Sequence, residues 1–296
     1  MEETPSPSRT GQQFTLASGR KLGFAEYGDA RGAPVLYCHG WPGSRLEAQA
    51  LHSAGTALGV RIVAVDRPGY GLSDFQPGRT LASWAADIGE LAGGLRLDRF
   101  AVLGVSGGGP FAMACAAGLG ERLSRVLLVC ALGPTDVPGV TRGMVFAHRW
   151  LLWLGRKAPA LARPIGRVSL KYLRRYPDRV VSPSVLNRLP ASDREAMQPG
   201  PFQQALTAGF REGLRDGVEG AVVDGTLYAK PWGFRLEEVR APVRLWHGEA
   251  DIIVPPAMGR HYARVLPNCR ATFHAGEGHF SLARKFAREV VAGAKA

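Results

Sequence analysis

Short runs of β-branched and aliphatic residues alternate with stretches of helical periodicity in both terminal parts of the chain. Each run ends in glycine, proline or polar residues, which is typical of buried strands that alternate with helices in a mostly parallel sheet. Positions 14–16 and 21–27 flank a Ser-Gly turn and predict an opening hairpin. Six further strands are predicted at 34–38, 60–65, 100–105, 125–131, 243–247 and 270–274. Because ligands bind at the carboxyl ends of strands in such sheets, we expect the functional residues to lie there.

The strand rhythm stops between positions 134 and 235. No convincing strand is found there, prolines punctuate the segment, and apolar residues recur at helical spacing. We therefore predict a core domain formed by residues 1–133 and 236–296 and a helical cap, or lid, formed by residues 134–235. Its aromatic residues are expected either to pack within the cap or to line a pocket. The three apolar stripes consist of Phe146, Trp150, Trp153 and Leu154; Ile165, Val168, Tyr172 and Tyr176; and Phe202, Leu206 and Phe210.

The length and composition narrow the class of protein. A chain of 296 residues with 46% apolar composition can bury the core of one large domain or of a domain with an insertion. Positions 1–13 are polar and predict a flexible tail, not a signal peptide. No run reaches the roughly 18 apolar residues of a membrane span, so we expect a soluble protein. The cysteines lie far apart, form no C-x-x-C pair and predict small buried side chains in the cytoplasm, with no metal site; they are Cys38, Cys115, Cys130 and Cys269.

The formal net charge of +12 is concentrated in the insertion, where 16 Lys and Arg face 8 Asp and Glu. No nucleic-acid motif or lysine-rich arm accompanies this charge, so we expect no nucleic-acid partner. Arg142, Arg149 and Arg156 recur every seven residues, on a face predicted to lie away from much of the aromatic stripe. Two interpretations remain open, a solvated outer face and an electropositive rim that attracts anionic substrates.

Positions 104–108 read G-V-S-G-G, directly after a predicted strand and before the helical run 110–118. This G-x-S-x-G pattern predicts a sharp strand-to-helix turn that exposes Ser106 in a strained backbone conformation. Glycines at 104 and 108 provide the space that such a turn needs. The amides at the start of the following helix point toward the site, where negative charge would develop. We therefore expect Ser106 to be a nucleophile.

A serine hydroxyl needs a base, and the base needs a group that orients it. His279 follows the last predicted strand and is the expected base, while Asp251 follows the strand before it and is the expected acid. Asp136, which also follows a strand, is the alternative acid. The other histidines are expected in packing, surface or strand-end positions; they are His39, His52, His148, His247, His261 and His274.

Stabilisation of an oxyanion requires two backbone N–H donors. Gly107, next to the nucleophile, is one expected donor. The loop 39–43, which reads H-G-W-P-G, supplies the other, and Trp41 is the natural choice because Pro42 has no N–H. The Trp41 ring could line the acyl pocket, together with Phe146, Trp150 and Phe210. We expect His39 to hydrogen-bond within its own loop.

Five motifs in order resemble the α/β-hydrolase superfamily, in particular its capped branch of esterases, proline iminopeptidase-like enzymes and carbon–carbon bond hydrolases. They read H-G-W-P-G-S, D-R-P-G-Y-G-L-S-D, G-V-S-G-G-G, G-E-A-D and G-E-G-H-F, and they span positions 39–280. The resemblance implies an eight-stranded, mostly parallel sheet with a cap after the sixth strand. It also implies catalysis through an acyl-enzyme without a cofactor. Haloalkane dehalogenases and epoxide hydrolases share the pattern but carry Asp where this chain has Ser106, which argues against both.

The sequence thus predicts a serine hydrolase that cleaves a carboxylic ester of a small molecule. The same side chains could act on an amide, a lactone, a thioester or a carbon–carbon bond. A small-molecule receptor of the same fold that binds without turnover is the alternative from another class. Neither the substrate nor the oligomeric state follows from the sequence.

Overall fold

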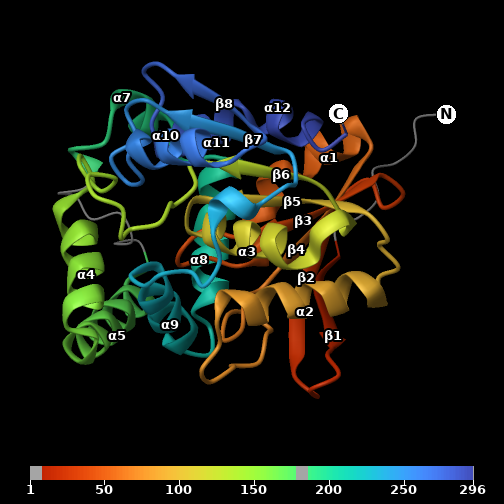
Figure 1. The fold of residues 1–296 in the computed structure, drawn as a ribbon, viewed down its shortest axis with the longest axis horizontal. Helices are drawn as coiled ribbons and strands as arrows, with labels where there is room; N and C mark the ends of the chain where they lie inside the picture. Colours follow the sequence, from red (N-terminus) through yellow and green to blue (C-terminus); the bar gives the residue numbers. More distant parts are fainter. Residues whose placement is uncertain (1–8, 178–185, 296) are drawn as a thin grey trace.

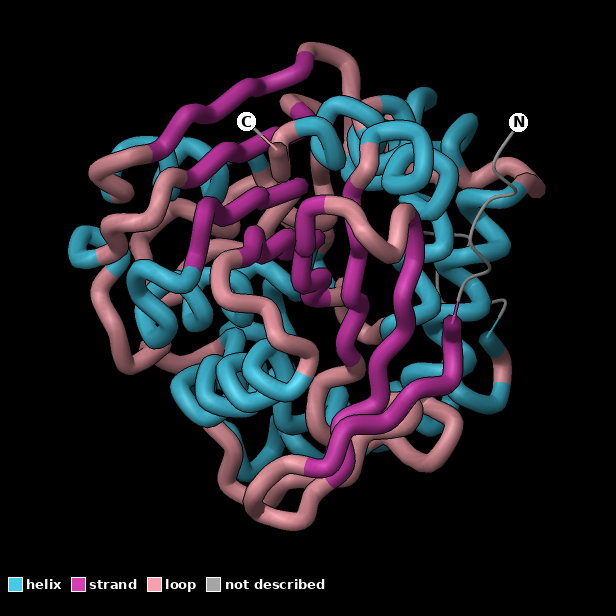
Figure 2. Tube along the Cα trace, turned by 90° about the vertical axis from the view of Figure 1, so that its right-hand side faces the viewer, coloured by secondary structure: helices cyan, strands magenta, loops and turns pink. Residues whose placement is uncertain are grey.

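Eight strands form one twisted sheet with the order β1-β2-β4-β3-β5-β6-β7-β8 in the computed structural model, which describes residues 9–177 and 186–295 (Figure 1). β2 is antiparallel to both of its neighbours, and every pair from β4 to β8 is parallel. The strands at the two edges are turned strongly relative to each other (Figure 2). The strands are β1 (Arg9–Thr15), β2 (Lys21–Gly28), β3 (Ala33–Cys38), β4 (Val60–Val65), β5 (Phe100–Val105), β6 (Leu123–Val129), β7 (Val243–Gly248) and β8 (Cys269–His274).

Helices cover both faces of the sheet. α2 (Leu81–Gly94), α3 (Gly109–Leu119) and α10 (Pro256–Val265) pack on one face, and α1 (His52–Leu58), α11 (His279–Lys285) and α12 (Ala287–Ala292) pack on the other. Successive side chains of a strand point to opposite faces. Leu36 and Cys38 of β3 therefore join the first core, while Val35 and Tyr37 join the second. Burial on both faces explains why these strands are continuous apolar runs in the sequence.

The insertion between β6 and β7 is helical, and its described residues contain no strand. The predicted interruption of the sheet is confirmed, and the sheet resumes at Val243. Figure 1 places α4, α5 and α9 together at the left margin of the molecule, beyond the carboxyl ends of the parallel strands. The helices of the insertion are α4 (Phe146–Lys157), α5 (Pro159–Arg175), α7 (Ala191–Ala196), α8 (Pro201–Gly213) and α9 (Glu219–Tyr228).

Two expectations about the chain are wrong. Part of the predicted tail, residues 9–13, belongs to β1, which pairs with β2 at the edge of the sheet; residues 1–8 lie outside the described part. The aromatic residues of α4 also do not pack inward, since Phe146, Trp150 and Trp153 are 64%, 40% and 56% exposed.

Small residues decide which face of α4 is buried. A Cβ atom at Gly155 would lie 2.9 Å from the Cβ atom of Ala229, so α4 approaches the end of α9 most closely at its Gly155 side. Leu154 and Gly155 are buried there. α5 likewise buries Gly166 and Leu170, and its predicted stripe faces outward. Periodicity shows which residues share one face of a helix, but the close approach of a neighbouring helix decides which face is buried.

No helix in residues 9–177 or 186–295 is long and apolar enough to cross a membrane. The predicted buried cysteines are found as free thiols, with Cys38, Cys115 and Cys130 buried and Cys269 partly buried.

Candidate active site

Ser106 occupies the turn between β5 and α3 with a backbone φ of 55°. A left-handed conformation at a residue other than glycine is uncommon and persists where the surroundings enforce it. A Cβ atom at Gly104 would lie 2.7 Å from that of Ala112, and one at Gly108 would collide with the carbonyl oxygen of Cys38. The glycines therefore permit the tight packing of this turn, as the sequence pattern predicted.

The three residues chosen from the sequence meet at the carboxyl edge of the sheet. Ser106 Oγ lies 3.0 Å from His279 Nε2, and His279 Nδ1 lies 2.7 Å from Asp251 Oδ2. The other carboxylate oxygen of Asp251 accepts two 2.8 Å hydrogen bonds from the N–H groups of Ile253 and Val254. Because the carboxylate can only accept, His279 donates from Nδ1 and offers the lone pair of Nε2 to the Ser106 hydroxyl.

The electrostatics of the pair match this arrangement. Burial alone would raise the pKa of Asp251, but the charge and hydrogen bond of His279 outweigh burial and hold the pKa below its usual value. Burial would lower the pKa of His279, whereas Asp251, Asp193 and Glu47 together raise it. The raised pKa makes the His279 imidazole a stronger base than a free histidine.

Asp193, which no sequence motif indicates, binds the segment that contains His279. It lies on α7 in the insertion and is fully buried. Its two carboxylate oxygens accept hydrogen bonds of 2.8–2.9 Å from the N–H groups of His279, Phe280 and Ser281. The insertion therefore provides the carboxylate that fixes the start of α11, and Asp193 is a positioning residue for His279.

Trp41 and Gly107, whose N–H groups are the predicted oxyanion donors, lie next to each other. The N–H of Gly40 donates to the buried carboxylate of Glu47 at 2.8 Å, which leaves Trp41 as the next donor in the loop. A Cβ atom at Gly107 would lie 3.3 Å from the Trp41 nitrogen and 2.7 Å from the Trp41 Cβ atom, so the two residues pack closely against each other. Tyr228 of α9 donates its hydroxyl proton to the carbonyl oxygen of Gly107 at 2.9 Å and fixes that peptide.

A buried network immobilises the loop that carries Trp41. His39 lies within hydrogen-bond distance of Gly40 O through Nδ1 (2.9 Å), while its Nε2 accepts the N–H of Arg67 at 3.2 Å, so its predicted role within the loop is confirmed. Arg67 donates to the carbonyl oxygens of His39 and Gly40. The guanidinium also pairs with Asp224 of α9 at 2.8 Å, and Arg79 pairs with the same carboxylate at 2.5 Å.

A cavity of about 420 Å³ opens over Ser106. This volume is typical of small-molecule sites, and the lining is mostly apolar. Phe202, Leu206 and Phe210 of α8 contribute one wall, as the third predicted stripe suggested. Further lining residues are Trp41, Glu47, His148, Leu173, Met197, Ile253 and Phe280.

For two of the four residues predicted to line the pocket, the prediction is wrong. Trp41 and Phe210 line the cavity, whereas Phe146 and Trp150 lie on the exposed face of α4. His148 of the same helix lines the cavity instead, and burial lowers its pKa. The alternative acid, Asp136, does not take this place, because His279 Nδ1 is hydrogen-bonded to Asp251.

Cys130, Asp251 and His279 have potential metal-ligating atoms within 4.8 Å of one another. Burial raises the pKa of the Cys130 thiol well above its usual value, so the sulfur stays protonated. Asp251 and His279 already satisfy each other. Within this group, the hydrogen-bonded Asp251–His279 pair has the arrangement of an acid–base pair.

The eight-stranded sheet with helices on both faces is the fold of the α/β-hydrolase family. The family model described as "alpha/beta hydrolase fold" matches residues 33–283, and the chain belongs to this family. The chain is 33% identical over 130 residues to a non-heme chloroperoxidase of Streptomyces lividans; this alignment covers 43% of this chain and 47% of that protein, about half of its length.

Solved structures resemble the whole chain. An esterase from Exiguobacterium antarcticum superposes with a TM-score of 0.70 at 22% identity, covering 97% of this chain and all of that one. The esterase RhEst1 from Rhodococcus sp. ECU1013 gives a TM-score of 0.66 at 21% identity, over 95% and 96% of the two chains. At this level of identity, the likeness establishes the fold.

Proposed function

We propose that this protein is a serine hydrolase that cleaves a carboxylic ester of a small molecule through an acyl-enzyme, that is, a carboxylesterase. The observation that carries the proposal is the hydrogen-bonded chain from Ser106 through His279 to Asp251 at the floor of a mostly apolar cavity. Two proteins of similar structure, from Exiguobacterium antarcticum and Rhodococcus sp. ECU1013, are esterases, which supports this proposal.

In the proposed reaction, Ser106 Oγ attacks the ester carbonyl carbon while His279 Nε2 takes the hydroxyl proton. The imidazolium is stabilised by the Asp251 carboxylate. The N–H groups of Trp41 and Gly107 hold the negative oxygen of the tetrahedral intermediate. When the C–O bond to the leaving group breaks, His279 returns the proton to the departing alkoxide. Water, activated by His279 in the same way, then releases the acid and restores Ser106.

The test combines labelling and turnover. We expect a fluorophosphonate to label the peptide that contains positions 104–109, and short-chain p-nitrophenyl esters to be hydrolysed. Ser106→Ala should abolish both results, whereas Ser169→Ala, at an exposed position on α5, should change neither. Labelling at another peptide, or full turnover by Ser106→Ala, would remove the proposal.

A panel of esters, amides, lactones, thioesters and carbon–carbon bond substrates decides which bond is cleaved, because one triad serves all of them. Stoichiometric binding of a small molecule without turnover would favour the receptor alternative.

We also propose that residues 134–235 act as a lid, since helices of this segment form much of the cavity wall. The cytoplasmic location stays a prediction from cysteine usage.

A further inference from the structure

The outer sides of α4 and α5 expose large apolar side chains to an unusual degree. Here the α4–α5 surface denotes the exposed apolar residues of these helices together with their exposed cations. On α4, Phe146, Trp150 and Trp153 recur at spacings of three and four residues on the side opposite the buried Gly155. On α5 and at the residue that follows it, Tyr176, the exposed apolar residues have the same spacing; they are Leu161, Ile165, Val168, Tyr172 and Tyr176. Single exposed apolar residues are ordinary, but a set of eight on two adjacent helices marks an interaction site.

The Lys and Arg residues of α4 and α5 give both helices a purely positive formal charge. Within Phe146–Lys157 and Pro159–Arg175 there are eight cations and no acidic residue. Arg167 forms an ion pair with Glu219 of α9 at 2.6 Å. The other seven cations are exposed and intersperse with the apolar residues; they are Arg149, Arg156, Lys157, Arg163, Lys171, Arg174 and Arg175.

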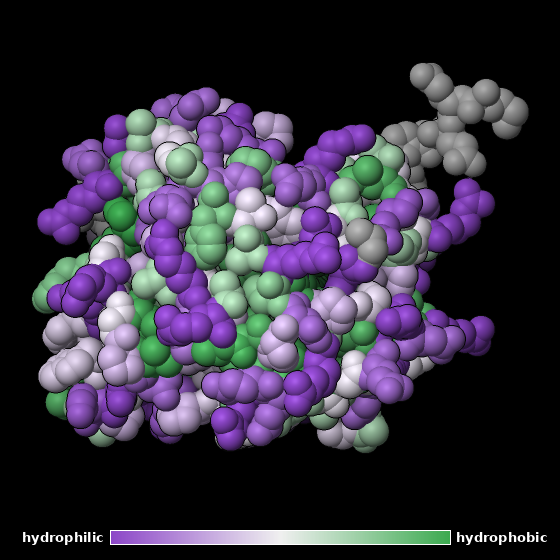
Figure 3. Space-filling view, turned by 45° about the horizontal axis from the view of Figure 1, so that its top comes forward, coloured by the Kyte–Doolittle hydropathy of each residue, from purple (hydrophilic) through white to green (hydrophobic). Residues whose placement is uncertain are grey.

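Figure 3 shows hydrophobic atoms next to strongly hydrophilic ones at the left margin, where α4 and α5 lie. Arg149 follows Phe146 by three residues, and Arg156 follows Trp153 by three, so cations and aromatics share one face of α4. The sequence predicted that these arginines lie away from much of the aromatic stripe; in the structure Arg149 and Arg156 are exposed, as are the aromatic residues of α4.

We propose that the α4–α5 surface binds the surface of an anionic lipid bilayer, with the aromatic and aliphatic side chains in the interfacial region and the arginines and lysines at the headgroups. Cationic helices that expose Trp, Phe and Leu bind in this way, and their affinity rises with both buried apolar area and anionic lipid content. Trp and Arg are suited to the boundary because each combines an apolar body with a polar end.

A second copy of the chain fits this surface less well. A symmetric interface would place the same patch on both subunits, so the seven exposed cations of one copy would face the seven of the other. No acid of either helix compensates that charge. An anionic bilayer supplies the opposite charge and an apolar layer at once.

The proposal does not depend on the proposed reaction, although the two are compatible. His148 of α4 and Leu173 of α5 line the cavity from the inner side of the same helices. A docked protein would therefore hold the cavity wall against the bilayer. Vesicle binding needs no turnover, so failure of the esterase assay and failure of membrane binding are separate results.

The test is sedimentation of the full chain with vesicles of phosphatidylcholine alone or mixed equally with phosphatidylglycerol. We expect binding to the mixed vesicles, weak binding to the neutral ones, and loss of binding as salt is raised. Tryptophan emission should shift to the blue on binding and should be quenched by lipids that carry bromine in the acyl chains. The wild-type protein alone gives these readouts, so no variant has to fold for the test to be decisive.

Two double variants divide the surface into its components. Trp150→Ser with Trp153→Ser should weaken binding at least about tenfold and remove the blue shift. Arg156→Gln with Lys157→Gln should weaken binding about tenfold and reduce its dependence on salt.

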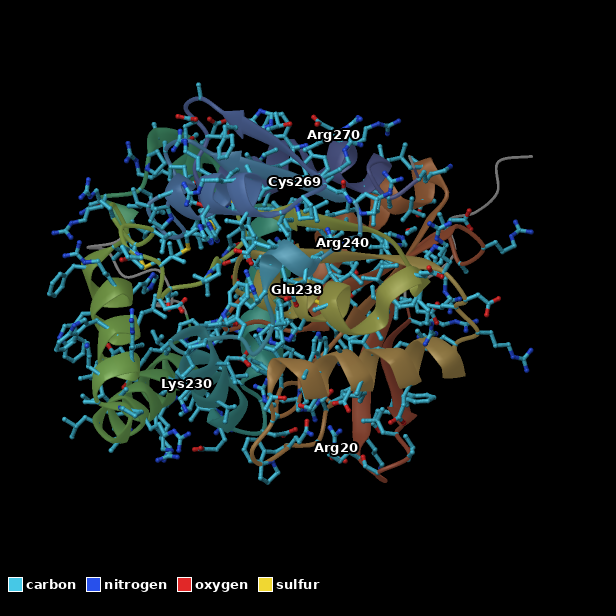
Figure 4. The ribbon with its side chains drawn as sticks, viewed as in Figure 1. Arg20, Lys230, Glu238, Arg240, Cys269 and Arg270 are labelled. Carbon is cyan, nitrogen blue, oxygen red and sulfur yellow. The ribbon has the colours of Figure 1, made fainter. Side chains whose placement is uncertain are left out.

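The controls are Phe75→Ser, an exposed aromatic outside the insertion, and Arg240→Gln with Arg270→Gln, both exposed and distant from α4 (Figure 4). Both controls should bind like the wild type. Equal loss in the controls, no binding to anionic vesicles at low salt, or a stable dimer in solution that the Trp150/Trp153 variant breaks would each overturn the proposal.

Discussion

Replacing Asp193 by asparagine should slow the proposed reaction without touching any group that reacts. Asp193 accepts three hydrogen bonds from the N–H groups of His279, Phe280 and Ser281. Asparagine has nearly the same shape, but only its amide oxygen can accept. If this oxygen keeps the bonds to Phe280 and Ser281, the NH₂ group faces the N–H of His279, and a donor meets a donor.

The size of the effect follows from these bonds. A hydrogen bond to a charged group contributes about 1.5–3 kcal/mol and a neutral one about 1 kcal/mol. Losing one charged bond and weakening two others removes roughly 4 kcal/mol of local stabilisation. If about half of this loss falls on the orientation of His279 toward Ser106, then kcat/KM drops about thirtyfold. The rest should appear as a lower free energy of unfolding.

The pH profile separates this role from simple damage to the fold. His279 must be neutral to accept a proton, so activity rises with pH through its pKa. The negative charge of Asp193 helps to raise that pKa, and its removal should move the acid limb of kcat/KM to lower pH.

The assay is the pH dependence of p-nitrophenyl ester hydrolysis, with Glu195→Gln as the matched control. Glu195 lies on α7 two residues from Asp193 and is exposed. The control removes the same charge and should leave rate and profile unchanged. An Asp193→Asn protein with wild-type kcat/KM and an unmoved acid limb would refute the assignment of Asp193 as a positioning residue.

Three other substitutions probe the walls of the site. Gly107→Ala should lower kcat by about a hundredfold with little change in KM, because the added methyl group would lie 2.7 Å from the Trp41 Cβ atom and crowd the oxyanion space; steady-state kinetics check this. Glu47→Gln keeps the shape of the side chain but replaces the carboxylate that accepts the Gly40 N–H. It should lower kcat several-fold in steady-state kinetics, and circular dichroism checks that the variant is folded. Phe210→Trp should shift the preferred acyl chain to shorter esters because a larger ring fills the cavity, and an unchanged chain-length profile would show that the acyl group binds elsewhere.

The sequence predicted the sheet and the convergence of the three side chains for one physical reason. Ser106, Asp251 and His279 each follow a predicted strand, and the carboxyl ends of parallel strands share one edge. The strand order therefore places Ser106 and His279, which are 173 positions apart, at one edge of the sheet, and in the structure their side chains lie 3.0 Å from each other. The glycines around Ser106 were also predictable from the sequence, because they are required by the conformation of a single turn.

What the sequence did not reveal depends on contacts between distant elements. Asp193 lies 86 positions before His279 on a helix of six residues, and nothing in its local pattern marks it as a partner of α11. Glu47 follows the predicted loop but shows its role only once its carboxylate meets the Gly40 N–H. The faces of α4 and α5 were misassigned since both sides of each helix carry apolar residues, and only packing against α9 distinguishes them.

The Asp224 carboxylate has a consequence for protein engineering. Arg67 and Arg79 belong to the core, are almost fully buried, and find their counter-charge on a residue of the insertion. A chimera that exchanged positions 134–235 for a homologous segment lacking this acid would leave two guanidinium groups unneutralised in the protein interior, a defect that costs several kcal/mol. Grafting a new specificity onto this scaffold therefore requires that α9 be kept, or that both arginines be redesigned together with the graft.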